Sequence, residues 1–384
     1  MVEWIECTIG DLCDTVSDTY RGNDENVILI NTSDVLEGKV LNHTQVPNKN
    51  LKGQFKKTFR KNDILFSEIR PANKRFAFID FEDTSNYIAS TKLMVLRHNE
   101  KVLPEYLFAI LKSNYILTEL QRLAETRSGT FPQITFSSEL APMKVNLPDK
   151  KVQKQILSIL SSIEKKMDIN EIINNNLEQQ AQTIYQQMFI DNPDPDWIEG
   201  SLSDIANITM GQSPSGSSYN VDGIGAIFFQ GRAEFGFRFP TIRLYTTEPK
   251  RMAYANDILM SVRAPVGDLN VAHNDCCIGR GLAAIHSKTN HQSFVHYTMF
   301  SIKKQLDVFN GEGTVFGSIN RNSLNDMPIL IPADEQIEKF ELIVAPMDAT
   351  IRNNYDEIRR LQAVRDSLLP RLMSGELDVS NIGL

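Results

Sequence analysis

Two long segments of the chain carry apolar side chains at alternating steps of four and three residues, which is the seam pattern of a coiled coil. The first segment, residues 149–189, contains neither Gly nor Pro. Its seam positions are Ile156, Leu160, Ile163, Met167, Asn170, Asn174, Leu177, Ala181, Ile184 and Met188. In the second segment the seam positions are Phe340, Val344, Met347, Ile351, Asn354, Ile358, Leu361, Arg365, Leu368 and Leu372. The pattern predicts one long helix in each segment.

Asparagine interrupts both seams near the middle, as Asn170 and Asn174 in the first and Asn354 in the second. A polar seam residue lowers stability but fixes register and partner. We therefore expect the two helices to pack on each other, in antiparallel orientation. The alternative is that each is an ordinary amphipathic helix on its own globular domain. Pro346 is expected to interrupt the second helix or to begin its main part, because an interior proline removes a backbone hydrogen bond.

Each long segment follows a stretch that contains the same series of short motifs. The paired motifs are "EWIECTIGDL" (3–12) with "DWIEGSLSDI" (196–205), "NDILFSEIRP" (62–71) with "NDILMSVRAP" (256–265), "YIASTKLMVL" (87–96) with "CIGRGLAAIH" (277–286), and "GTFPQITFSSELAPMKVNLP" (129–148) with "GTVFGSINRNSLNDMPILIP" (313–332). Motifs in one order predict a tandem duplication of a domain, and the drift of their offsets from 193 to 184 residues indicates loops that changed in length. The period is far too long for a solenoid.

Short runs rich in branched and aromatic residues predict strands inside each copy. They are 26–31, 63–69, 75–80 and 92–98 in the first copy, and 226–231, 257–262 and 282–287 in the second. One amphipathic helix is expected after them in each copy, at 104–124 and 292–309. The sequence thus predicts two similar α+β globules, each followed by a long helix.

Net charge, the length of apolar runs and the spacing of the cysteines limit the classes to which the protein can belong. The chain has 384 residues and a net charge of −8, so no global positive charge announces a nucleic-acid partner. No apolar run approaches the roughly 18 residues of a membrane span, and the first residues show no signal-peptide pattern. The cysteines, Cys7, Cys13, Cys276 and Cys277, form no metal or disulfide spacing and are interpreted as small buried side chains in a cytoplasmic protein.

The motifs of common enzymes are missing from the sequence. It contains no dinucleotide-binding or phosphate-binding glycine motif, no paired metal-ligating histidines, and no N/D-P-P-Y/F tetrapeptide of aminomethylating enzymes. "GEGTVFG" (311–317) is interpreted as a turn. We expect a non-catalytic chain with no cofactor and no metal.

Local charge differs from the net charge. Residues 49–75 hold nine basic side chains against two acidic ones, an excess of +7, and residues 231–263 hold six against three. Clustered Lys and Arg bind phosphates, and Arg can also fork onto guanine. The candidate DNA-binding residues are Lys52, Lys56, Lys57, Arg60, Lys61, Arg70, Lys74, Arg75, Arg232, Arg243, Lys250, Arg251 and Arg263. The loop 210–220 is either another base-reading loop or merely a flexible one.

These features together resemble the specificity subunit of type I restriction–modification systems. The resemblance rests on the two W-I-E openings, the two NDIL motifs and the two segments that run from Gly-Thr through an Ile to an apolar–Pro step. It also rests on "IPADEQIEKF" (331–340) and the ending "LLPRLMSGEL" (368–377). One departure is "LPDKKVQKQI" (147–156), which has Lys-Val-Gln where the second copy has Glu-Gln.

The resemblance implies a function for each segment. Residues 1–148 and 191–332 would be target recognition domains, and residues 149–190 and 333–384 would be spacer helices that form an antiparallel coiled coil. The chain would read a bipartite, asymmetric site in double-stranded DNA and dock two adenine-N6 methylation subunits, with two restriction subunits where these are present. The alternative is a stand-alone DNA-binding regulator or a coiled-coil scaffold.

Overall fold

The computed structural model describes residues 4–49, 51, 53–127, 132–311 and 317–379. They fold into two compact units. Unit 1 combines residues 1–168 with 358–384, and unit 2 comprises residues 169–357. Among the described residues, none of the helices has the length and apolar character that a membrane span requires.

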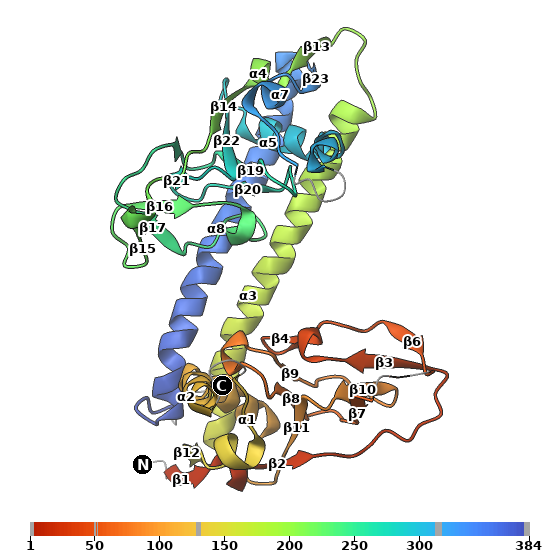
Figure 1. Cartoon of the computed structure of the whole chain (residues 1–384), viewed down its shortest axis with the longest axis vertical. Helices are drawn as coiled ribbons and strands as arrows, with labels where there is room; N and C mark the ends of the chain where they lie inside the picture. Colours follow the sequence, from red (N-terminus) through yellow and green to blue (C-terminus); the bar gives the residue numbers. More distant parts are fainter. Residues whose placement is uncertain (1–3, 50, 52, 128–131, 312–316, 380–384) are drawn as a thin grey trace. The chain divides into compact units, whose positions relative to one another are not determined.

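Unit 1 contains two four-stranded sheets and a two-stranded ribbon (Figure 1). The first sheet has the order β2 (Cys13–Val16), β11 (Leu93–His98), β8 (Ile64–Ser67) and β9 (Phe76–Phe78). The second has the order β6 (Gln45–Pro47), β3 (Asn26–Ile30), β10 (Tyr87–Ser90) and β7 (Phe55–Lys57), with β10 parallel to β3. The ribbon pairs β1 (Trp4–Thr8) with β12 (Lys144–Pro148), and a small hairpin pairs β4 (Val35–Leu36) with β5 (Lys39–Val40).

Unit 2 repeats the strand order of the first sheet and the pairing of the ribbon, whereas its second sheet has five strands. Its four-stranded sheet has the order β14 (Ala206–Met210), β22 (Leu282–Ser287), β19 (Ile258–Ser261) and β20 (Leu269–Val271). Its second sheet has the order β15 (Tyr219–Asn220), β17 (Leu244–Thr246), β16 (Ala226–Phe229), β21 (Cys276–Ile278) and β18 (Met252–Ala253), with β16 parallel to β21. The ribbon pairs β13 (Ile198–Ser201) with β23 (Pro328–Ile331). The shared topology confirms the predicted duplication and all seven predicted strands.

The repeated opening motif closes each copy. Its first residues form the ribbon strand that pairs with the apolar–Pro step, Trp4 opposite Pro148 in unit 1 and Ile198 opposite Ile331 in unit 2. The hydroxyl and acidic residues of the motif then form a capping box at the following turn. In unit 1 the backbone N–H and hydroxyl of Thr8 donate to Asp11 at 2.8 and 2.7 Å. Ser201 and Asp204 repeat this arrangement in unit 2.

The NDIL motif forms a tight turn that leads into the central strand of the four-stranded sheet. Its asparagine takes a left-handed backbone conformation in both units, with φ of 71° at Asn62 and 75° at Asn256. The buried aspartate that follows accepts a backbone N–H three residues earlier, at 2.9 Å for Asp63 and 2.8 Å for Asp257. Its other partner differs, since Arg97 binds Asp63 with two hydrogen bonds whereas His286 binds Asp257. The motif is therefore structural.

Each copy was expected to contain one amphipathic helix after its strands, and each contains two. Unit 1 has α1 (Pro104–Leu111) and α2 (Asn114–Arg127), and unit 2 has α5 (Gln292–Ser301) and α6 (Lys303–Leu306). The break occurs where ψ is near zero, −2° at Lys112 and 5° at Ile302, so the backbone leaves the helical path. Shorter helices α4 (Leu202–Ile205) and α7 (Arg321–Asn325) complete unit 2.

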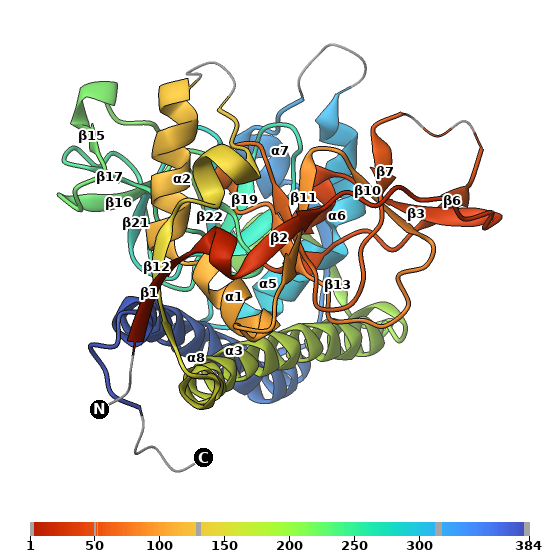
Figure 2. The ribbon, with the colours of Figure 1, turned by 90° about the horizontal axis from the view of Figure 1, so that it is seen from below.

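The two predicted long helices are α3 (Lys150–Tyr185) and α8 (Asp334–Met373), and Figures 1 and 2 show them side by side. In unit 2, Asn354 Nδ2 donates to Asn174 Oδ1 at 2.9 Å, and Asn170 Nδ2 donates to Glu357 Oε2 at 2.7 Å. Because the residue numbers of these partners run in opposite directions, the helices are antiparallel. In unit 1, buried residues of both helices belong to one core, including Ile156 and Leu372. The coiled coil is confirmed.

The alternative, in which each long helix packs on a globular domain, also describes part of the structure. The first half of α3 and the last part of α8 share the core of unit 1, whereas the second half of α3 and the start of α8 share the core of unit 2. Each globule therefore packs on both helices. Pro346 was expected to interrupt or begin the second helix, but α8 continues through it. Pro346 and Leu342 are exposed, so water can bond the carbonyl that the proline leaves without a partner.

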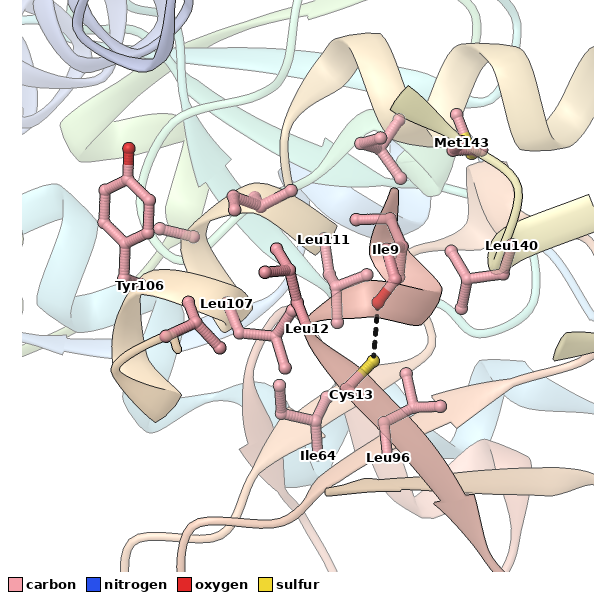
Figure 3. Packing of buried hydrophobic residues seen from close by; sticks show 14 of the residues in the cluster. Ile9, Leu12, Cys13, Ile64, Leu96, Tyr106, Leu107, Leu111, Leu140 and Met143 are labelled. Carbon is pink, nitrogen blue, oxygen red and sulfur yellow. Dashed lines mark hydrogen bonds between the residues drawn. The ribbon is translucent and has the colours of Figure 1, made fainter. Parts of the chain in front are cut away.

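The core of unit 1 lies between its first sheet (β2, β11, β8 and β9), the helices α1 and α2, and the long helices. Figure 3 shows Ile9, Leu12 and Cys13 packed against side chains of β8, β11 and α1. The Cys13 thiol donates to the carbonyl of Ile9 at 3.6 Å, and burial raises the pKa of Cys13 to about 12. Burial likewise raises the pKa of Cys276 to about 12. These thiols stay protonated, as expected for buried apolar residues.

Candidate nucleic-acid interface

Three basic residues of unit 1 extend unpaired charges into solvent. Lys56 lies on β7, Arg60 follows that strand, and Arg70 follows β8; all three are exposed. Within the described part of the chain, no side chain or carbonyl binds their charged groups. Exposed cations without partners are available to neutralise phosphate groups.

Two other candidates in unit 1 use their side chains within the fold. Lys57 is half-buried, and its ammonium group donates to the carbonyls of Thr91 and Leu93 at 3.1 and 2.8 Å. Burial lowers the pKa of Lys57. Arg75 donates to the carbonyls of Ser33 and Val35 at 3.1 and 3.4 Å. Both side chains hold neighbouring segments of the chain together, so their charged groups are already engaged within the fold.

The remaining candidates of unit 1 form surface ion pairs or lie outside the described residues. Lys61 pairs with Glu82, and Lys74 pairs with Glu37 at 3.1 Å. Exposed pairs of this kind contribute about 0–1 kcal/mol, so a phosphate group can displace the carboxylate. Lys52 lies outside the described residues. Phe59 and Phe66 of the same stretch are buried in the core, so they are not available for stacking on bases.

The candidates of unit 2 are all exposed: Arg232, Arg243, Lys250, Arg251 and Arg263. Arg232 forms an ion pair with Asp268. For the other four, no partner of the charged group is present in the described ranges. Arg232 and Arg263 come together at a cleft, which Arg243, Lys250 and Arg251 do not line.

The cleft has a volume of about 370 Å³ and lies where four connections of unit 2 meet. The connections follow β14, β16, β19 and β21, and they contribute Ser213, Gln230 to Glu234, Ser261, Arg263, Ala264, Arg280 and Gly281. Ser213 Oγ accepts the backbone N–H of Arg280 at 3.2 Å, which joins two of the connections. Glycine permits their close approach, since a Cβ atom at Gly281 would lie 2.8 Å from the carbonyl oxygen of Gln230.

Sequence reasoning missed Arg280, which lies outside both basic windows. The signal was present in the motif "CIGRGLAAIH", where Arg280 stands between Gly279 and Gly281. Ser213 of the cleft belongs to the loop 210–220, so one side chain of that loop lies beside the arginines. The structure thus places part of this loop at the cleft.

Arg238, one of the six basic residues counted in unit 2, is buried in a charged cluster between the second sheet and the long helices. Its side chain is 6% exposed and lies 2.5 Å from Asp348 Oδ1 and 3.7 Å from Glu178 Oε1. It also donates to His296 Nε2 at 2.7 Å. Burial and the arginine lower the pKa of His296, so the imidazole stays neutral and accepts this bond. Arg238 therefore cannot contact DNA.

No group of three His, Cys, Asp or Glu side chains in the described ranges could hold a metal ion. The exposed cations of both units are instead suited to bind the anionic backbone of a nucleic acid. The cleft of unit 2 adds a concave site with guanidinium groups.

Known proteins share this arrangement over their whole length. The type I restriction enzyme HindI specificity subunit of Haemophilus influenzae is 30% identical, over 98% of this chain and 100% of that protein. A chain solved for the structural basis of complex assembly and conformational transition of the type I R-M system is 26% identical, covering 98% of this chain and 100% of that chain at a TM-score of 0.50. The type I restriction-modification S subunit of M. genitalium shares the fold at 15% identity and a TM-score of 0.53, covering 97% and 96%.

The family described as the type I restriction modification DNA specificity domain matches residues 1–179 and 195–362, which contain both copies of the repeat. This match confirms the resemblance seen in the sequence, including a role in DNA recognition in place of catalysis. The chain belongs to the family of type I restriction modification DNA specificity domains.

Proposed function

We propose that this chain selects the DNA site of a type I restriction–modification complex by reading a bipartite, asymmetric sequence. Residues 1–148 would read one half-site and residues 191–332 the other. The helical segments 149–190 and 333–384 would set the gap and dock two methylation subunits in the cytoplasm, together with two restriction subunits where these are present. The methyl-transfer chemistry would belong to the docked subunits.

One observation carries this proposal: the two units share the strand order of the first sheet and the ribbon pairing but differ in the number and positions of their exposed basic residues. A repeated fold offers two equivalent docking surfaces to one kind of partner, because duplication produces pseudo-twofold symmetry. Different surface residues on that fold allow each unit to recognise a different sequence. Both units carry exposed cations despite the net charge of −8.

The test is to map methylated adenines by single-molecule sequencing of DNA from a methylation-deficient host. The host would express the chain together with its candidate methylation subunit, and the matched control would express the methylation subunit alone. We expect one split motif with adenine N6-methylation on both strands, absent from the control. A stable, soluble complex that produces no new methylation would favour the regulator or scaffold alternative.

Removal of the unpaired charges of Lys56 and Arg60 tests their role in unit 1. We expect the variant with Lys56→Gln and Arg60→Gln to bind all sequences more weakly, because phosphate contacts carry no sequence information. The slope of log K against log salt should fall by about 0.9 for each phosphate that the variant no longer neutralises. The measurement is a salt titration of binding by the methylation complex to cognate and scrambled duplexes.

Lys39→Gln is the matched control, since Lys39 is an exposed lysine of unit 1 that pairs with Asp168. It should leave the salt slope nearly unchanged. If the double variant instead lost its preference at one base position, Lys56 or Arg60 would contact a base rather than the backbone.

A further inference from the structure

The cleft of unit 2 brings together three arginines from three different connections. Arg232 follows β16, Arg263 follows β19 and Arg280 follows β21. Arg232 is engaged by Asp268, whereas the guanidinium groups of Arg263 and Arg280 have no partner in the part of the chain that the structure describes. Both are exposed, so each is free to donate its planar pair of N–H groups to a ligand.

A carboxylate lies in the same cleft. Glu234 lines it, and its Oε2 atom is buried without a hydrogen-bond partner among the described residues. A carboxylate oxygen accepts hydrogen bonds, so a ligand group placed against Glu234 must carry a donor. A phosphate group has no such donor and would be repelled by the carboxylate. The cleft is therefore suited to a neutral ligand that offers both hydrogen-bond acceptors and a donor.

The major-groove edge of a G·C base pair offers this combination. Guanine presents the acceptors O6 and N7, to which an arginine donates with two hydrogen bonds, and cytosine presents its N4 amino group, which a glutamate accepts. We infer that this cleft reads one G·C pair of the half-site recognised by unit 2. Arg263 or Arg280 would bind the guanine and Glu234 the cytosine. This inference rests on the proposed function.

The same positions in unit 1 carry different chemistry. In unit 1 Ile28 lies opposite Tyr87, as Ile227 lies opposite Cys276 in unit 2. Ser33 therefore stands where Arg232 does, and Thr91 stands where Arg280 does. Ile134 N–H bonds to Glu68 in unit 1 as Ile319 N–H bonds to Val262 in unit 2, which places Ile69 at the position of Arg263. None of these three residues of unit 1 is charged. The G·C reading therefore belongs to one half-site only.

The experiment maps methylated adenines in cells that express the methylation subunit with the wild-type chain or with a single variant. The variants are Glu234→Gln, Arg263→Gln and Arg280→Gln, and Arg321→Gln is the control because Arg321 is an exposed arginine of unit 2 outside the cleft and outside the candidate DNA-binding residues. We expect Glu234→Gln and at least one arginine variant to relax the same G·C position of one half-site. Discrimination there should fall about 5- to 150-fold, as for removal of one bidentate pairing with a base.

The outcomes separate this inference from the proposed function. The other half-site and the gap should stay unchanged in every variant, which also shows that the protein remains folded. Arg321→Gln should leave the motif as in the wild type. A wild-type split motif that no cleft variant relaxes, or a uniform loss of methylation from the arginine variants, would overturn the inference alone. Absence of any wild-type motif would instead count against the proposed function.

Discussion

Replacement of Arg238 by alanine is expected to lower the free energy of unfolding of unit 2 by about 3–5 kcal/mol, as for other broken buried ion pairs. The substitution leaves Glu178 and Asp348 without the cation that neutralises them. Burial already raises the pKa of Glu178, so its charged form depends on the arginine. Few single substitutions in proteins cost this much.

Tryptophan fluorescence during urea unfolding can report on unit 2 alone. The chain contains two tryptophans, Trp4 in unit 1 and Trp197 in unit 2, so a Trp4→Phe background leaves one reporter. Trp197 packs against Phe189 in the core of unit 2, with ring centroids 5.9 Å apart. The matched control is Arg243→Ala, an exposed position where about 0.5 kcal/mol or less is expected.

The dependence on pH and a compensated variant test the cause of the destabilisation. Burial raises the pKa of Glu178, so without Arg238 the folded protein holds a proton on Glu178 at a higher pH than the unfolded chain does. Stability then falls as pH rises, so the deficit of Arg238→Ala should be smaller at pH 5 than at pH 7. The triple variant Arg238→Met, Glu178→Gln, Asp348→Asn should recover much of the stability, because it leaves no unpaired buried charge. An equal deficit in both variants and at both pH values would indicate poorer packing instead.

The duplication and the strands could be predicted because they depend on local patterns. The role of each motif could not be predicted, because it depends on contacts with residues far away in the sequence. Asp63 is fixed by Arg97, 34 positions later, and the equivalent Asp257 by His286. The first strand, β1, was not predicted at all, since within the described ranges it pairs with β12 alone, more than a hundred residues away. Register between distant strands leaves no local signal.

Charge windows in the sequence could locate basic regions but not the direction of each side chain. Arg238 and Arg243 are five residues apart, yet one is buried between carboxylates and the other is exposed. Lys56 and Lys57 are adjacent on β7, where successive side chains point to opposite faces, and only Lys57 reaches the carbonyls of Thr91 and Leu93. Arg280 was not predicted as a site residue, because the turn that brings it to the cleft depends on tertiary structure.

Lengthening both long helices together is expected to change the gap of the recognised site without changing either half-site. Each helix passes from one compact unit to the other, α3 between Asp168 and Ile169 and α8 between Glu357 and Ile358. In unit 2 the antiparallel register is fixed by the hydrogen bond between Asn174 and Asn354. Equal insertions at these two points keep the register of each unit, and whole heptads keep the seam on the same helix face.

The length of the insertion decides the result, because DNA turns as it advances. One heptad in each helix adds about 10 Å, the length of roughly three base pairs. A gap longer by three base pairs would rotate one half-site about the DNA axis by about 100° relative to the other. We expect methylation of the original motif to be lost. Three heptads in each helix add about 32 Å, close to one turn of DNA. Methylation should then return at a motif with the same half-sites and a gap about nine to ten base pairs longer, detected by the same sequencing.

The control is an insertion of three heptads in α3 alone, which adds the same sequence to one helix only. It breaks the register that Asn174 and Asn354 fix. It should abolish methylation at every site. Co-purification with the methylation subunit shows whether each lengthened chain still assembles. If the lengthened pair of helices assembled and methylated the original motif with an unchanged gap, the helices would not act as the ruler between the half-sites. The gap would then be set by the docked subunits, and the coiled coil would serve only to join the two units.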